Sequence, residues 1–214
     1  MDTLQSKKQT LAELRAQVQK LEAEIRAAEG GQATPQWPPQ GFYGAYYANS
    51  GFMLGGIASI TSLVLNILGA PLADKNPLEL IRVYLTFPLG GRALELGAER
   101  GTLILLLGCC LYVATGVMLG VPFFVALARL AGDGGLKKRM IVATVLSLLL
   151  WCINFYLILS WLQPLLFGGD WITDPSILPP WVAAGTHLIF GWTLALLYPL
   201  GKFEPYRTTT QSGA

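Results

Sequence analysis

Three polar side chains, His187, Asn66 and Asn154, lie inside long apolar runs of this chain. An ionisable or amide group is costly to place in hydrocarbon, so it marks a functional site by default. His187 is the only histidine, and an imidazole can ligate a haem iron, hydrogen-bond a quinone or relay a proton. The structural alternative is a neutral ring that hydrogen-bonds Asn66, Asn154 or a backbone carbonyl. The three residues form the candidate polar cluster, and both interpretations stay open.

No catalytic pattern accompanies this cluster. His187 has no acidic neighbour, and no Asp or Glu is expected inside an apolar run, so neither a Ser-His-Asp triad nor paired carboxylates are supported. A single histidine cannot build a tetrahedral zinc site. Cys109, Cys110 and Cys152 lie within apolar runs, and we interpret them as small buried hydrophobes. We expect no enzyme, no metal and no cofactor, with haem or quinone as the alternative.

Four apolar runs must position these residues. We expect membrane-spanning helices over residues 51–70, 101–131, 140–167 and 181–200, because about 20 apolar residues cross a hydrocarbon core of roughly 30 Å. Hydrophobic residues make up 53% of the chain and charged residues 13%, and the mean hydropathy is +0.49. Soluble domains contain about 25% charged residues. The sequence therefore predicts an all-α integral membrane four-helix bundle with membrane lipid around it.

Loop charges predict the orientation. Residues 129–139 contain four Lys or Arg and one Asp, whereas residues 168–180 contain two Asp and no base. The positive-inside rule places the first loop in the cytoplasm, together with both termini and the tail over residues 201–214. We expect a bacterial inner membrane. The net charge of +2 is too small to indicate a nucleic-acid partner.

A short helix is expected over residues 77–87, between the first two spans. Asn76 is a favoured N-cap residue, and Pro77 follows it at the first helical position. About ten residues cannot cross a bilayer, so this helix lies flat at the outer interface or covers the bundle as a re-entrant segment. It is either structural cover or a functional lid, and Arg82 and Tyr84 are its candidate lid residues.

Residues 1–29 are predicted to form an amphipathic coiled-coil helix, and residues 30–50 a linker and interfacial segment rich in proline, glycine and aromatic residues. Antiparallel pairing would set Arg15 opposite Glu22, which favours a different partner chain or a docked helix over a parallel homodimer. Packing of this helix on its own membrane domain is the alternative. Apolar residues recur at alternating spacings of three and four, and the seam consists of Leu4, Leu11, Leu14, Val18, Leu21, Ile25 and Ala28.

Small residues recur four apart in three of the spans. Such spacing lets helix backbones approach closely in a membrane, either within this bundle or against a neighbouring chain. The residues concerned are Gly51, Gly55 and Ser59, then Gly116 and Gly120, then Gly191 and Ala195.

The run Gly185-Thr186-His187-Leu188-Ile189-Phe190-Gly191, continuing to Tyr198, resembles the last helix of some uncharacterised four-helix bacterial inner-membrane proteins. The resemblance covers that helix only and does not include the amino-terminal helix. It implies a membrane bundle and no particular activity.

These observations lead to three functional expectations. The first is a non-enzymatic accessory or scaffold subunit that recruits a protein partner, or a second copy of itself, through residues 4–28. The alternative is a binder of a small hydrophobic ligand (lipid, quinone or haem) near His187 at the outer face, in the manner of a respiratory-complex accessory subunit. A small channel or transporter is the third, although neither an inverted repeat nor an unwound span is evident.

Overall fold

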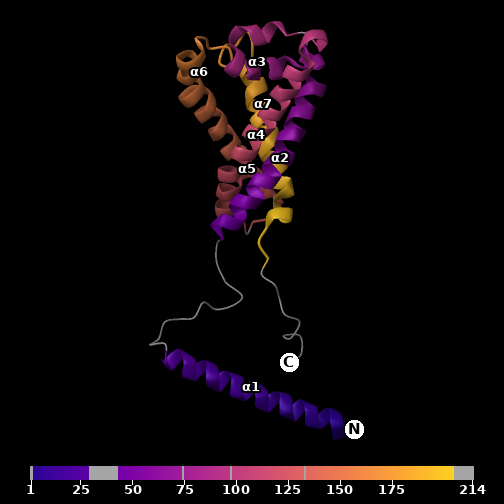
Figure 1. Ribbon diagram of the computed structural model, residues 1–214, viewed down its shortest axis with the longest axis vertical. Coiled ribbons are helices and arrows are strands. Elements are labelled where there is room, and N and C mark those ends of the chain that lie inside the picture. The colour runs from indigo at the N-terminus through magenta and orange to yellow at the C-terminus, as the bar shows by residue number, and fades with distance from the viewer. Residues whose placement is uncertain (1, 29–42, 74, 97, 133, 205–214) are drawn as a thin grey trace. The chain divides into compact units, whose positions relative to one another are not determined.

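The computed structural model describes residues 2–28, 43–73, 75–96, 98–132 and 134–204. Every regular element in these ranges is helical and none is a strand, which confirms the all-α class (Figure 1). The chain divides into two units, residues 42–203 and residues 1–41 with 204–214.

In the second of these units, the helix α1 (Asp2–Ala28) is continuous over 27 residues. Several parts of this unit and its neighbouring segments lie outside the described residues. They are Glu29, the linker over residues 30–42, the tail from residue 205, and the side chains of Leu4, Ile25 and Ala28. A coiled coil needs a second helix, so its formation stays a prediction.

The described part of residues 42–203 contains four helices that are long and apolar enough to cross a membrane, which fits an integral membrane protein. The first is α2 (Gly44–Gly69), and the second is the apolar part of α4 (Ala98–Ala131). The fourth is α7 (Pro180–Leu197), extended by the 3₁₀ turn η4 (Tyr198–Gly201). Large apolar side chains on these helices are exposed, such as Leu103 at 75% and Met118 at 73%. Lipid solvates such an apolar surface favourably, whereas its exposure to water would be unfavourable.

Of the expected helix boundaries, the start of the first span differs most from the structure. Residues 44–50, expected in an interfacial segment, are the first turns of α2. The helix continues through these aromatic and polar residues because a helix satisfies its backbone groups internally where no water is available. Pro122 lies inside α4, and the helix continues on both sides of it.

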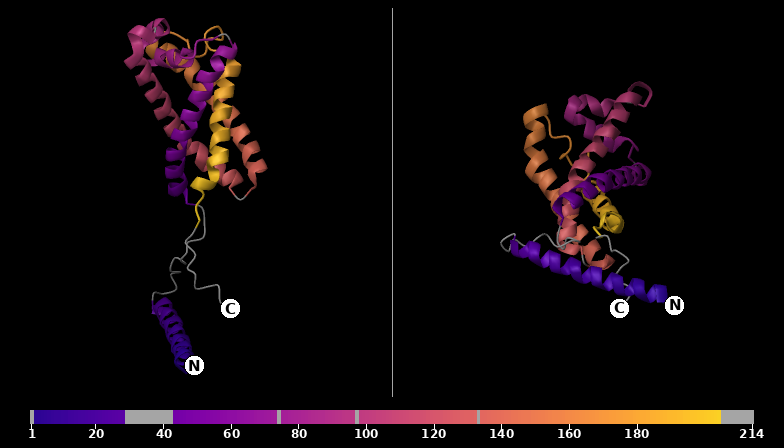
Figure 2. Two further views of the ribbon diagram at one scale, coloured as in Figure 1. Left: turned by 90° about the vertical axis from the view of Figure 1, so that its right-hand side faces the viewer. Right: turned by 60° about the horizontal axis from the view of Figure 1, so that its bottom comes forward.

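The third span is built from three pieces. α5 (Leu136–Cys152) is followed by a π-helix, η3 (Ile153–Leu159), and then by α6 (Ser160–Phe167). At the end of η3 the Ser160 N–H bonds to the Phe155 carbonyl, five residues back. Pro164 follows within α6 and has no N–H with which to hold the Ser160 carbonyl. The third span therefore changes its helical winding midway along its length, and α6 leans away from α4 (Figures 1 and 2).

Glycines bring α2 and α4 into direct backbone contact. A Cβ atom added to Gly55 would lie 2.7 Å from the Gly116 carbonyl oxygen and 2.9 Å from the Gly120 Cα. A Cβ added to Gly51 would lie 2.5 Å from the Gly120 oxygen. The small-residue spacing therefore serves packing within this bundle, and Ser59 joins the same seam against Gly116. Gly191 of α7 is equally tight against Ser147 of α5.

The helix α3 (Glu79–Leu89) lies across one end of the bundle, called the capped end (Figure 1). The Asn76 side chain accepts the Leu78 N–H at 2.9 Å in a turn that precedes this helix. The N-cap residue is Leu78, which makes no side-chain cap bond, so the expected N-cap at Asn76 and helix start at Pro77 are wrong. Gly90 stops the helix with a φ of 62°. Ile81 and Leu85 are buried against Leu63 of α2 and Leu105 of α4, so α3 covers the bundle. After it come the 3₁₀ turn η2 (Gly90–Glu95) and the start of α4.

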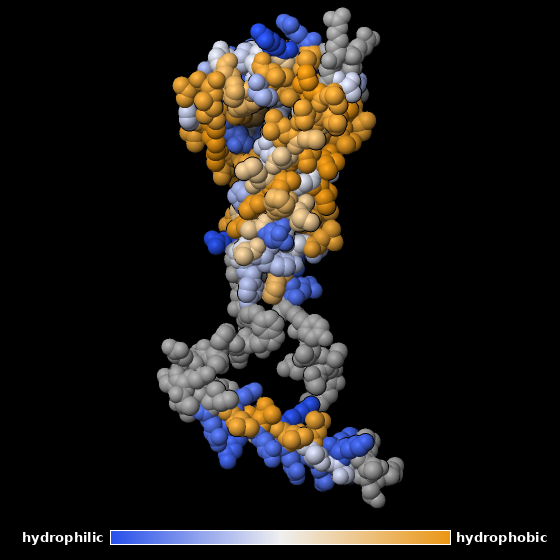
Figure 3. All heavy atoms as spheres, in the orientation of Figure 1, coloured by the Kyte–Doolittle hydropathy of each residue, from blue (hydrophilic) through white to orange (hydrophobic). Residues whose placement is uncertain are grey.

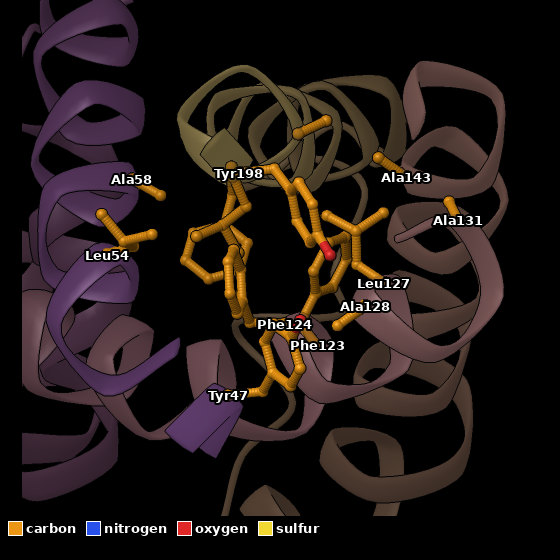
Figure 4. Close-up of a cluster of buried hydrophobic side chains, with 13 residues drawn as sticks. Tyr47, Leu54, Ala58, Phe123, Phe124, Leu127, Ala128, Ala131, Ala143 and Tyr198 are labelled. Atoms are coloured by element: carbon orange, nitrogen blue, oxygen red, sulfur yellow. The ribbon is translucent and has the colours of Figure 1, made fainter. Parts of the chain in front are cut away.

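The opposite end, called the terminal end, contains the largest buried cluster. Phe124 of α4 is fully buried, 5.4 Å from the ring of Tyr198 and 6.3 Å from that of Tyr47 (Figure 4). Tyr43 and Phe203 have ring centroids 4.5 Å apart, so the first and fourth spans begin and end at this face. The bundle is thus tightly filled at the terminal end.

The cysteines lie partly on the bundle surface. Cys110 and Cys152 are exposed and Cys109 is half-buried, so the expectation of three buried hydrophobes is wrong for two of them. In lipid an apolar side chain has nearly the same free energy whether it faces the lipid or the protein. The rule that apolar residues lie inside soluble domains therefore does not predict where such a residue lies.

Candidate functional site

A cavity of about 430 Å³ lies between the second and third spans, toward the capped end. α4 forms one wall, and η3 with the adjoining turns of α5 and α6 forms the other. Leu80, Val83, Tyr84 and Phe87 of α3 close it at the end of the bundle. The cavity exists because α6 leans away from α4 after the π-helix. In Figure 3 a hollow opens in the apolar surface beside α6, and hydrophilic side chains are visible inside it.

His187 and Asn154 meet in the wall of this cavity. The His187 Nδ1 lies 2.8 Å from the Ala183 carbonyl oxygen, one turn earlier in α7. Its Nε2 lies 3.4 Å from the Asn154 side-chain nitrogen, which η3 presents from the third span. The Phe155 ring packs edge-on against the imidazole at 6.0 Å. The π-helix thus supplies both of the neighbours that the third span gives to His187.

A second polar network joins α2, α4 and α7 beside the cavity. The Ser62 hydroxyl donates to the Thr186 carbonyl at 3.0 Å and lies 3.1 Å from the hydroxyl of Tyr112, which is in the cavity wall. The Thr186 hydroxyl reaches the Asn66 side-chain oxygen at 3.1 Å, and the Asn66 amide donates to the Ser62 carbonyl at 2.8 Å. Each polar group in this network has a partner, as burial in an apolar medium requires.

The structure therefore brings together two of the three residues in the predicted cluster. Asn66 does not line the main cavity. It lines a smaller cavity of about 210 Å³ at the capped end, together with Lys75 and Glu79. Thr186 lies between the two cavities and lines both.

The two candidate lid residues point to different places. Tyr84 lines the main cavity, and its ring lies 5.5 Å from that of Tyr112. Burial raises the pKa of the Tyr84 phenol, and a hydrogen bond with Thr115 opposes that shift in part. The phenol is therefore neutral at physiological pH. Arg82 lies 3.7 Å from Glu79 on its own helix and is not part of the cavity wall.

Sequence reasoning missed Tyr112, Thr186 and Gln163. Gln163 is fully buried, donates to the Thr86 hydroxyl at 2.8 Å and accepts the Ile172 N–H at 2.9 Å. It therefore ties α6 to α3 and to the loop that leads to α7. An amide inside the third apolar run was a usable signal, of the same kind that identified Asn154. Hydroxyls are common in membrane helices and gave no such signal.

The cavity is lined by apolar and neutral polar groups. Among the described residues, no Asp, Glu, Lys or Arg forms part of its wall. Within the same part of the chain, no three His, Cys, Asp or Glu side chains come close enough to hold a metal ion. An apolar cavity with a few converging polar groups is the usual form of a small-molecule site. This wall therefore offers no charged partner to a charged molecule.

No family model, curated protein or solved structure matches this chain.

Proposed function

We propose that this chain is an integral membrane protein that binds an uncharged lipophilic molecule in the cavity between α4 and α6. The carrying observation is the convergence of His187, Asn154, Tyr84 and Tyr112 on one apolar cavity of about 430 Å³. A tightly packed structural bundle does not need such a space, because unfilled volume forfeits packing contacts. Haem is disfavoured, since its two propionates would find no cationic partner among the described wall residues.

The same proposal includes an orientation. The basic loop between α4 and α5 lies at the terminal end, where the Arg139 guanidinium stacks over the Tyr198 ring at 5.1 Å. The positive-inside rule then places the terminal end in the cytoplasm and the cavity in the outer half of a bacterial inner membrane.

Filling the cavity tests the proposal. Leu111 lines the cavity and is 40% exposed, so a Leu111→Trp side chain has room to enter without disturbing the buried core. We expect the wild-type chain, purified in mild detergent, to retain a lipophile that mass spectrometry detects after organic extraction. Leu111→Trp should retain at least about tenfold less of it, because a steric block of this size costs more than 1.4 kcal/mol of binding.

The matched control is Leu106→Trp on the same helix, which is 58% exposed and lies outside the cavity wall. It should retain as much lipophile as the wild type. If both variants and the wild type contain the same bulk membrane lipids and nothing else, the cavity binds no specific ligand and the proposal fails.

A second candidate function is recruitment of a different protein through α1, which would make this chain an accessory subunit. One observation favours it: within their own unit, the described seam residues of α1 are exposed, from Leu11 at 49% to Leu21 at 56%. A helix with such a stripe is stabilised by packing against another helix. The antiparallel charge pattern suits a helix of a different chain.

Seam substitutions test this recruitment. Leu14→Glu with Leu21→Glu should abolish stoichiometric co-purification of the partner from detergent extracts, because two charges would face the apolar seam. The control, Ala16→Glu with Ala23→Glu, adds the same charge on the opposite side of the helix and should retain the partner. A partner that stays with the seam variant would contradict the idea, as would a purified protein that is a homodimer through α1.

A further inference from the structure

Most polar side chains in the cavity wall already use their donor protons in hydrogen bonds within the protein. This can be followed group by group, because each hydroxyl has one proton and a backbone carbonyl can only accept. What remains free determines which chemical groups a ligand must bring. The argument rests on the proposed binding function and adds the class of ligand.

The imidazole of His187 presents a lone pair. Its Nδ1 faces the Ala183 carbonyl at 2.8 Å, so Nδ1 holds the proton. In the neutral ring, Nε2 is then the acceptor. The Asn154 N–H that points at it does so from 3.4 Å, which is long for a hydrogen bond. Nε2 is therefore weakly engaged and can accept from a ligand.

The phenol of Tyr112 also presents lone pairs. Ser62 gives its single proton to the Thr186 carbonyl at 3.0 Å. In the Ser62–Tyr112 contact of 3.1 Å, the phenol must therefore be the donor. Once that proton is used, the Tyr112 oxygen can only accept.

The same reasoning applies to the remaining hydroxyls in the wall. Thr115 donates to the Leu111 carbonyl at 3.0 Å, so its oxygen can only accept from a ligand. Thr186 donates to the Val182 carbonyl at 2.8 Å or to Asn66. Among these groups, the second N–H of Asn154 and the phenol proton of Tyr84 are the protons that no hydrogen bond within the described residues assigns to an acceptor.

We infer that the cavity takes a ligand that donates hydrogen bonds, namely a lipophilic alcohol or phenol such as a long-chain isoprenoid alcohol or a hydroquinone. Its hydroxyl would donate to His187 Nε2 or to a tyrosine oxygen, and its chain would fill the apolar space. A ketone, ester or quinone oxygen would face lone pairs at most of these positions. A site built around acceptors discriminates against an analogue that has no proton to give.

A matched pair of probes tests the inference. The intact protein in lipid nanodiscs is titrated with 4-dodecylphenol and with its methyl ether, 4-dodecylanisole, and empty nanodiscs of the same lipid give the partition background. The two probes share the ring, the chain and the oxygen, and the ether has a methyl group in place of the hydroxyl proton. We expect the phenol to bind at least about fivefold more tightly than the ether, the value of one net hydrogen bond.

Substitutions identify the acceptor. His187→Phe keeps a ring and removes the lone pair, so the ratio of the two affinities should fall toward one. Leu196→Phe, on the exposed face of the same helix, should leave the ratio unchanged. If His187→Phe fails to fold, the comparison of the two probes on the wild-type protein still tests the inference.

The outcomes separate this inference from the proposed function. Equal binding of phenol and ether to the wild type, or tighter binding of the ether, overturns the donor requirement and leaves the cavity as a binding site. A preference for the phenol that persists in a folded His187→Phe protein shows that the imidazole is not the acceptor and also overturns it. If neither probe binds above the empty-nanodisc background, the proposed function fails as well.

Discussion

Replacing Gly55 with leucine should prevent the bundle from forming, or lower its free energy of unfolding by more than about 3 kcal/mol. Even the first carbon of the new side chain would lie 2.7 Å from the Gly116 carbonyl oxygen. The three atoms nearest to this carbon all belong to the backbone of Gly116 and Gly120, and they cannot rotate away. Overpacking in a core that can relax costs about 1–3 kcal/mol, and here α2 and α4 would have to separate. Unfolding in detergent, followed by circular dichroism, gives the measurement.

Gly69 provides the control in the same helix. No atom lies within 4 Å of a Cβ added there, so Gly69→Leu should be neutral, or stabilising by up to about 1 kcal/mol through higher helix propensity. A Gly55→Leu protein as stable as the wild type would show that α2 and α4 do not pack through their glycines.

Gln163→Leu should lower the free energy of unfolding by about 2 kcal/mol. The leucine has a similar size, but it leaves the buried Ile172 N–H without its acceptor, at a cost of about 1–3 kcal/mol. It also removes the bond to Thr86 that joins α6 to α3. Since α3 and α6 border the cavity on two sides, hydrogen exchange should quicken in residues 79–89 and 160–178. The same unfolding experiment measures the stability change.

A double-mutant cycle sharpens this prediction. Thr86→Val removes the other partner, so the combined loss in Gln163→Leu with Thr86→Val should be smaller than the sum of the two single losses. Ser160→Ala, which alters an exposed hydroxyl of α6, should have little effect. Strictly additive losses would mean that the two side chains do not act together.

The sequence could predict the two polar residues of the site, but it could not show that they lie next to each other. His187 and Asn154 stand out because each is polar within an apolar run. Their approach depends on the winding of the third span, where the π-helix η3 presents Asn154 toward α7. No periodicity marks such a segment beforehand. Asn66 stood out on the same grounds, yet it lies in the wall of a different cavity.

Four spans and the helix that follows Asn76 were determined by local sequence. The transfer of about 20 consecutive residues into lipid depends on those residues alone, and the turn that starts at Asn76 is held by a bond between residues two apart. Tertiary structure alone decided that Gly55 meets Gly120, that Gln163 holds Thr86 and Ile172, and that a cavity remains beside His187. These contacts join residues far apart in the chain, and an apolar helix can face lipid or protein at nearly equal cost. Packing geometry, rather than composition, therefore positioned the site.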